Sequence, residues 1–262
     1  MLMLTHTCLL QQIMSESNIR HGDPDIYIYN IAPDLLTIHP GISANQTHSI
    51  QRFIQSPQNH QRVSYIMFHL LVDDLAHYGN ISLDYHEGFD PHSSGYTYLK
   101  GRPLIESIIN LHKIIARDIT YSEAAYRSHL IIEMIYDLVI LSHIQKNNSI
   151  ELLEEAIHFT LNNKAKEFCD EIAWLYGIEK SDVLEVLKNA VSYMTKGRME
   201  RIMNIEGRIR LFTDKFGLRN DNSTFAAAIQ TLFQDALSSV ENEDFLRETA
   251  ATIRDYGWLP TV

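Results

Sequence analysis

Cysteine is scarce in this 262-residue chain, which contains only Cys8 and Cys169. Two cysteines so far apart form neither a disulfide framework nor a thiolate zinc motif. Long apolar runs are also lacking, because no stretch reaches the roughly eighteen residues that a membrane-spanning helix needs. The first residues have no basic side chain before Arg20 and do not resemble a secretory signal peptide. We therefore expect a cytoplasmic protein without a transmembrane segment.

Basic residues are few compared with acidic ones. The chain has 22 lysines and arginines against 33 aspartates and glutamates, which gives a formal net charge of −11. This balance disfavours nucleic acids and anionic membranes as partners held by bulk charge. A small phosphoester or a phospholipid-like molecule remains acceptable as a substrate, because bound cations would reverse the local field. The sequence does not define the oligomeric state.

Strand-like alternation is absent, and nearly every long segment repeats its apolar residues at the helical period. We therefore predict an all-α fold, a multi-helix bundle. Pro24 and Pro33 predict irregular turns over 22–42, and a loop is expected over 84–102, which is rich in Tyr, Gly, Ser and His. The expected helices cover roughly 5–16, 45–56, 60–80, 103–117, 121–146, 150–160, 163–177, 181–196, 199–217, 223–238 and 243–255.

Histidine, aspartate and glutamate candidates concentrate before residue 145, and His158 is the single histidine after it. We interpret 1–147 as a metal-binding catalytic region and 148–262 as a helical annex. The pattern leaves open whether the annex forms part of the same domain.

Two pairs of side chains, His69-x3-Asp73 and His129-x3-Glu133, lie in otherwise apolar, helix-patterned segments. Residues four apart share one face of a helix, so each pair presents an imidazole and a carboxylate in the same direction. Burying a carboxylate among leucines and isoleucines is costly unless a cation or a hydrogen-bond donor compensates its charge. Two such pairs predict a metal site, and His, Asp and Glu ligands are typical of hydrolytic metal centres.

His77 extends the first pair by one more turn. The helical rise places His69 and His77 about 12 Å apart, too far for both to bind one ion at about 2 Å. The helices that carry the two pairs would therefore share at least two ions, as in bundle-type metal centres. Asp73 would lie between these ions. Further ligands are expected from the preceding irregular segment, which offers Asp34, His39 and His48. We prefer His48 to His39 because we expect His48 to open a helix.

The order of these residues resembles that of the zinc-dependent phospholipase C family, which is all-helical and related to the P1/S1 nucleases. The stretch Phe68–His77 resembles the family's H-x3-D-x3-H signature, and Ser128–Glu133 resembles its H-x3-E pair. Asn30–Asp34 resembles a turn that carries a metal-binding aspartate. His48 follows fourteen residues later, and His6 falls where the family has an N-terminal histidine.

This resemblance covers about 1–140 and implies a di- or trinuclear zinc centre that hydrolyses phosphate esters. It assigns one zinc to Asp34, His48, His69 and Asp73, and a second to His77, His129 and Glu133. Asp73 would bridge to a third ion bound by His6, and we take Asp34 as the general base. In secreted members the third ion also uses the free amino terminus, whereas His6 follows five residues here. Iron or manganese would accept the same ligands.

The expected loop 84–102 follows directly on the H-x3-D-x3-H segment, so it can overhang the metal site. We take its polar residues as candidate substrate contacts, above all Tyr85, His86, His92 and Lys100. A solvated connection is the alternative. A second polar run, 196–219, holds seven basic residues. We interpret it as a helix face that pairs with the acidic surplus rather than as a phosphate or partner site.

Other metal-dependent folds fit less well. An HD-type phosphohydrolase needs an adjacent His-Asp pair, which the sequence lacks. A ferritin-like di-iron bundle needs two Glu-x-x-His motifs, of which only Glu155–His158 occurs. Two functions compete with a phosphoester hydrolase. One is a non-catalytic helical interaction protein with a structural or vestigial metal site. The other is a P1-type nuclease that stacks bases on the tyrosines of 84–102.

Overall fold

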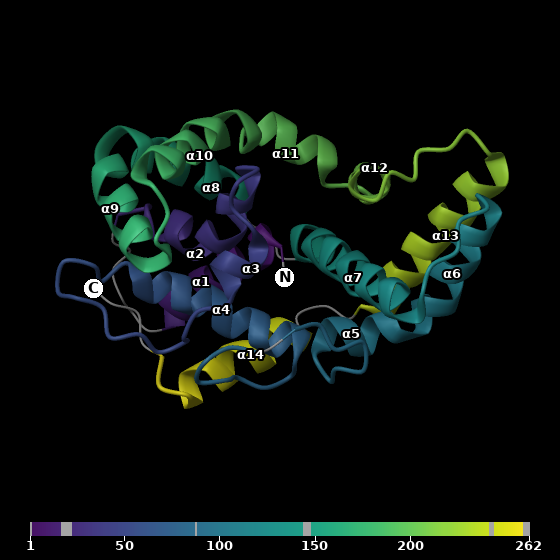
Figure 1. The fold of residues 1–262 in the computed structure, drawn as a ribbon, viewed down its shortest axis with the longest axis horizontal. Coiled ribbons are helices and arrows are strands. Elements are labelled where there is room, and N and C mark those ends of the chain that lie inside the picture. Colours follow the sequence, from purple (N-terminus) through teal and green to yellow (C-terminus); the bar gives the residue numbers. More distant parts are fainter. Residues whose placement is uncertain (1, 17–22, 87, 144–147, 241–243, 259–262) are drawn as a thin grey trace.

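A computed structural model describes residues 2–16, 23–86, 88–143, 148–240 and 244–258. Every regular element in these ranges is helical, which confirms the predicted all-α class (Figure 1). Among the described helices, none is long and apolar enough to cross a membrane. The elements in chain order are α1 (Met3–Glu16), α2 (Ile26–Leu35), η1 (Leu36–Ile38), α3 (Ala44–His48), α4 (Val63–His77), α5 (Tyr96–Gly101), η2 (Arg102–Leu104), α6 (Ile105–Ile114), α7 (Tyr121–His143), α8 (Ser149–Phe159), η3 (Thr160–Lys164), α9 (Ala165–Tyr176), α10 (Lys180–Tyr193), α11 (Lys196–Ile202), α12 (Ile205–Lys215), α13 (Ser223–Ser239) and α14 (Asp244–Asp255).

The helix expected over 45–56 is much shorter than the sequence predicts. It ends at His48, as α3, so His48 closes a helix instead of opening one. The Arg52 guanidinium turns back and donates to the carbonyl oxygens of His48 (2.9 Å) and Ile50 (2.6 Å). Arginine often satisfies the last carbonyls of a helix in this way. The chain then runs without regular structure to the start of α4.

Residues 22–42 contain a helix where the sequence predicted irregular turns. Pro33 lies inside α2, but the helix continues only two residues beyond it, so the loss of one hydrogen bond to proline is tolerated. The second half of 84–102, expected to be a loop, likewise forms α5 and the start of η2.

The helix expected over 199–217 is divided into α11 and α12. The Asn204 side chain caps α12 by accepting a hydrogen bond from the Gly207 N–H (2.8 Å). A Cβ on Gly207 would lie 2.6 Å from Ile202 Cα. Glycine therefore permits the close approach that this corner between the two helices requires.

Helix α4 lies at the centre of the fold. It packs against α2, α5, α14 and α1, and buried residues cover nearly its whole circumference, as expected for a helix enclosed on all sides. Helix α7 packs against α5, α6, α13 and α1. The two helices that carry the predicted metal ligands are thus both embedded in the protein, and α1 contacts both of them (Figure 1).

The two halves of the chain share one hydrophobic core. Helix α8 packs against α1 and α2, α13 against α6 and α7, and α14 against α1 and α4. One cluster of buried apolar residues extends from Leu4 in α1 to Trp258 after α14. The Trp258 indole also donates to the carbonyl oxygen of Ser64 in α4 (3.0 Å). The described residues of the annex therefore belong to the same structural unit as the metal-binding region.

The start of α5 approaches the end of α4 closely at Gly95. Its φ of −61° suits any residue, but a Cβ would overlap the carbonyl group of His77 at the end of α4. We expect Gly95→Ala to lower the free energy of unfolding by about 1–3 kcal/mol through overpacking. Urea denaturation measures this change.

Gly197→Ala is the matched control, because a Cβ at this position in α11 meets no atom within 4 Å. This variant should be neutral or more stable by up to about 1 kcal/mol. Equal unfolding midpoints for the two variants would contradict the close packing at Gly95.

Candidate metal centre

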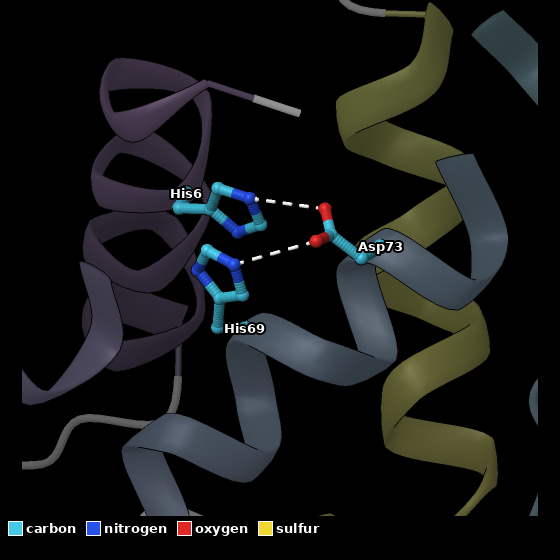
Figure 2. Close-up of side chains that lie close together, drawn as sticks. All are labelled: His6, His69 and Asp73. Atoms are coloured by element: carbon cyan, nitrogen blue, oxygen red, sulfur yellow. Dashed lines mark ion pairs between the residues drawn. The ribbon is translucent and has the colours of Figure 1, made fainter. Parts of the chain in front are cut away.

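His69 and Asp73 lie one turn apart on α4, and both are buried. His6, from α1, stacks on His69 with the ring centroids 3.7 Å apart. Figure 2 shows both imidazoles directed at the Asp73 carboxylate. Oδ1 of Asp73 lies 3.2 Å from His6 Nε2, and Oδ2 lies 3.3 Å from His69 Nε2. One buried carboxylate therefore faces two imidazoles.

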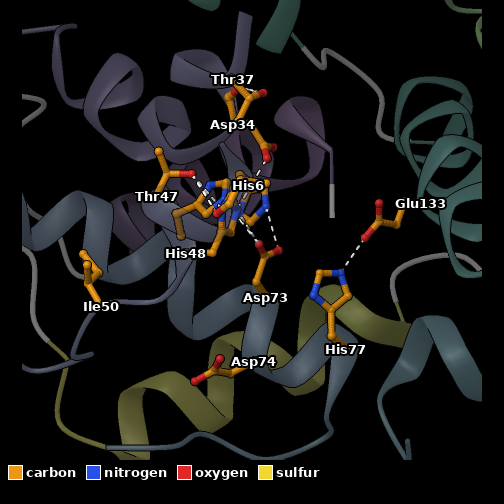
Figure 3. A network of polar contacts seen from close by, with 12 residues as sticks. His6, Asp34, Thr37, Thr47, His48, Ile50, Asp73, Asp74, His77 and Glu133 are labelled. Carbon is orange, nitrogen blue, oxygen red and sulfur yellow. Dashed lines mark hydrogen bonds and ion pairs between the residues drawn. The ribbon is translucent and has the colours of Figure 1, made fainter. Parts of the chain in front are cut away.

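His48 also approaches this carboxylate, and Asp34 lies beside His48 (Figure 3). Asp34 lies in the last turn of α2, and His48 is the last residue of α3. His48 Nε2 lies 3.4 Å from Asp73 Oδ2 and 3.6 Å from Asp34 Oδ1. His39, the alternative ligand, lies elsewhere, and its Nδ1 accepts a hydrogen bond from the Gly41 N–H (3.2 Å). The structure thus places His48 with the other candidate ligands.

A second group of ligands lies one turn further along α4. His77 Nε2 is 2.6 Å from Glu133 Oε1, and its ring centroid is 5.5 Å from that of His129 (Figure 3). We call His77, His129 and Glu133 the outer group, and His6, Asp34, His48, His69 and Asp73 the inner group. Because His77 follows Asp73 by one helical turn, the two groups adjoin. The α4 and α7 segments therefore meet at the point where the two sequence motifs predict.

All eight side chains predicted as ligands are brought together in three groups, two of which share His69. Within each group, one ligand atom per residue lies within 4.8 Å of the others. His6 shares its group with His69 and Asp73, and His69 also belongs to the group that contains Asp34. The groups are His6, His69 and Asp73; Asp34, His48 and His69; and His77, His129 and Glu133.

The inner distances match those between ligands of a common cation. Ligand atoms at about 2.05 Å from a tetrahedral zinc ion lie about 3.3 Å from one another. The four inner separations between imidazole nitrogen and carboxylate oxygen are 3.2, 3.3, 3.4 and 3.6 Å. A direct charge-assisted hydrogen bond is shorter, about 2.7–2.9 Å. The inner group thus has the spacing that a shared ion requires.

Buried ring nitrogens supply a further test of whether a metal fits. Among the described residues, none forms a hydrogen bond with either ring nitrogen of His69. Buried polar atoms are normally paired, and each unpaired one costs roughly 1–3 kcal/mol. Coordination of a cation would compensate a ring nitrogen. The residues therefore fit a divalent ion, and their nitrogen and oxygen donors suit zinc, iron or manganese.

A buried arginine holds His48 in place. The Arg52 guanidinium binds both carboxylate oxygens of Asp74 (3.0 and 2.8 Å), and Asp74 adjoins the ligand Asp73 on α4. Arg52 also contacts the His48 carbonyl, as described above. Nδ1 of His48 lies 2.9 Å from both the Ala44 carbonyl oxygen and the Thr47 hydroxyl. In the tautomer that donates to the carbonyl, Nε2 is left for coordination.

A second buried acid fixes α1 to α7. Asp137 lies one turn beyond Glu133 and accepts hydrogen bonds from the Thr5 backbone N–H (3.0 Å) and hydroxyl (2.7 Å). Thr5 precedes His6, so this contact sets the position of His6 relative to α7. Arg208 of α12 binds the other oxygen of Asp137 (3.1 Å).

Burial and the carboxylates determine the charges in the site. Burial lowers the pKa of His6 to about 4 and that of His129 to about 3, so both rings are neutral at pH 7, the form that binds metal. Burial also disfavours protonated His48, but Asp34 and Asp73 outweigh this effect and raise its pKa to about 10. The two carboxylates thus attract positive charge, as a cation site must.

A cavity of about 960 Å³ opens onto both ligand groups. Of the four predicted substrate contacts, His86 lies in its wall, stacked on Tyr78. The structure places the other three outside this wall. Residues 96–101 coil into α5 and carry Lys100 to Asp244 (3.4 Å). The ring of His92 stacks on Tyr121, and Tyr85 is exposed.

Of the three aromatic residues beside His129, Phe89 and Tyr126 were missed at the sequence level, whereas Tyr98 is one of the tyrosines of 84–102 considered there. The Tyr98 ring stacks on His129 (4.7 Å between centroids), and Phe89 and Tyr126 lie 6.3 and 5.0 Å away. All three line the cavity. Tyr126 precedes His129 by three residues on one helix, so this spacing was a usable signal. Nothing in the composition of 84–102 distinguishes Phe89 from its solvated residues.

Comparisons with protein-family models, with curated proteins and with solved structures found no match. The resemblance to the zinc-dependent phospholipase C family therefore rests on the motifs alone.

Metal content tests the candidate centre directly. We expect the purified, zinc-loaded protein to retain two or more ions per chain after dialysis, measured by elemental analysis. His69→Ala and Glu133→Ala should each lose at least one ion, because each removes a ligand from a different group. A chelator should lower the midpoint of thermal unfolding, since an ion that binds only the folded chain stabilises it.

His158→Ala is the control, because His158 is exposed on α8 and lies outside the three groups. Its metal content should equal that of the unaltered protein. Metal-free protein after zinc loading, or equal losses in all three variants, would contradict the proposed ligands.

Proposed function

We propose that this protein is a metal-dependent hydrolase of phosphoric esters. The observation that carries the proposal is the pair of adjoining His/carboxylate groups on one cavity. Divalent ions held there would lower the pKa of a bound water and offset the negative charge of phosphate oxygens. The motif resemblance to zinc-dependent phospholipase C supports the same class of reaction.

Three properties of the chain would serve this reaction. Asp34 lies on the cavity and is half-buried, so its carboxylate is within reach of a water that enters the site. We assign it the role of general base, which accepts the proton of the attacking water. The buried His69 and Glu133 keep the inner and outer groups fixed. The apolar surroundings of α4 and α7 strengthen electrostatic contacts with a phosphate group.

Hydrolysis of bis-p-nitrophenyl phosphate tests the activity. His69→Ala and Glu133→Ala should abolish turnover while far-UV circular dichroism stays unchanged. Asp34→Asn keeps an oxygen atom that can bind a metal ion but removes the basic carboxylate. It should lower kcat about 100-fold or more. His158→Ala should retain full activity, because its side chain lies outside the centre.

Retained activity in both alanine variants would rule the proposed centre out. Bound metal without turnover of any phosphoester would instead support a non-catalytic interaction protein with a structural metal site.

A P1-type nuclease is a second candidate, supported by the aromatic residues at the cavity. Phe89 and Tyr126 are 40% and 39% exposed and lie beside His129, where bases of a single strand could stack on them. For a nuclease we expect cleavage of single-stranded DNA, with Phe89→Ala and Tyr126→Ala raising KM. The net charge of −11 weighs against this function. Turnover of small diesters without DNA cleavage would exclude it.

A further inference from the structure

The annex supplies a second wall of the cavity that contains the metal ligands. Helices α10, α11 and α12 follow one another along one edge of the molecule (Figure 1). Residues of α11, of the turn after it and of α12 line the cavity together with His77, His129 and Glu133. The part of the chain without a recognisable motif therefore takes part in forming the site.

The side chains of this wall share one face of each helix. On α11 and the turn after it they follow at helical spacing, and on α12 they lie four residues apart. We call this set the annex wall. It comprises Arg198, Met199, Ile202, Met203, Leu211 and Lys215. Four of the six are apolar, and the two basic residues stand at the ends of the set.

The annex wall is held in a fixed position beside α7. At one end of α12, Arg208 binds Asp137 of α7 (3.1 Å), and both side chains are buried. At the other end, the Phe216 ring packs against Tyr126 and under the Arg127 guanidinium (6.4 and 4.5 Å). The α12 residues between these contacts therefore run alongside the stretch of α7 that contains His129 and Glu133.

The basic residues of the annex wall are available to an anion. Three other basic residues of the run 196–219 have acidic partners, namely Lys196 with Glu151, Arg208 with Asp137 and Arg219 with Asp214. This pairing is what the sequence predicted for the whole run. By contrast, Lys215 and Arg198 form no ion pair with any described residue, and Arg198 lies over the Tyr193 ring (4.4 Å).

We propose that the annex wall determines substrate specificity by binding the organic group of the phosphoester. Met199, Ile202 and Met203 form a flexible apolar surface, because methionine adapts to ligands of varied shape. Lys215 contacts an anionic oxygen on the same molecule. The preferred ligand is therefore a phosphate or phosphonate with an apolar substituent. This inference rests on the phosphoester hydrolase proposed above.

Calorimetric binding of alkylphosphonates from ethyl to hexyl to the zinc-loaded protein tests the proposal without requiring turnover. Each added methylene should lower Kd about three- to fourfold, as expected for a buried methylene. Ile202→Thr and Met203→Gln should flatten this dependence on chain length. Lys215→Gln should weaken binding by a similar factor at every chain length and leave the dependence unchanged.

Leu83→Gln and Lys188→Gln are the matched controls, because both residues lie outside the cavity wall. They should bind the series as the unaltered protein does, and circular dichroism and urea midpoints establish that all variants fold. A Kd independent of chain length, an unchanged dependence in Ile202→Thr and Met203→Gln, or no phosphonate binding would overturn the proposal. Chain-length-dependent binding without hydrolysis of bis-p-nitrophenyl phosphate would instead refute only the catalytic function.

Discussion

The burial of carboxylates on α4 and α7 is the constraint on which the rest of the structure depends. Asp73 and Glu133 are 5% and 4% exposed, and the transfer of each charge out of water costs several kcal/mol unless it is compensated. Each carboxylate also stands one helical turn from an imidazole of its own helix. Further imidazoles must come from other elements, and His6 and His48 arrive on α1 and α3. The positions of α1 and α3 beside α4 therefore compensate the buried charge of Asp73 as well as bury apolar side chains.

Each ligand helix carries a second buried acid that positions a histidine from another segment. Asp74 binds Arg52, which holds the His48 carbonyl. On α7, Asp137 binds the backbone of Thr5, the neighbour of His6. The same arrangement thus occurs twice. On each helix one carboxylate faces the metal centre, and a second carboxylate binds the segment that carries a histidine to that centre. Such outer contacts orient ligands and tune their affinity for metal.

The sequence predicted the site best where the candidate metal ligands lie at helical spacing on a single helix. His69, Asp73 and His77 belong to one helix, so their relative positions follow from the rise and twist of that helix. The meeting of α4 with α7 was expected because both carry buried polar residues that need partners. Asp34 and His48 were placed by motif resemblance, and the helical geometry around them differed from the expectation. Their segment is short and is shaped by tertiary contacts that local propensity does not encode.

Interactions between distant segments could not be predicted in the same way. Arg52 is an isolated basic residue in the sequence, and nothing near it shows that it binds a buried aspartate on α4. Helices α11 and α12 have ordinary amphipathic patterns, so their apolar residues were indistinguishable from core. Their exposure to the cavity results from the corner at Gly207 and from the anchor at Arg208. Both features become visible only once the chain has folded.

The charge of the cavity links phosphate binding to metal binding. Three carboxylates of the candidate ligands line it, against the basic groups of Arg198 and Lys215 in the annex wall. A phosphate dianion entering the metal-free site would lie close to these three carboxylates, where solvent screening of their repulsion is weak. Divalent ions reverse the sign of this field. Linkage between two ligands is reciprocal. If bound ions raise the affinity for the phosphoester by some factor, the bound phosphoester must raise the affinity for the ions by the same factor.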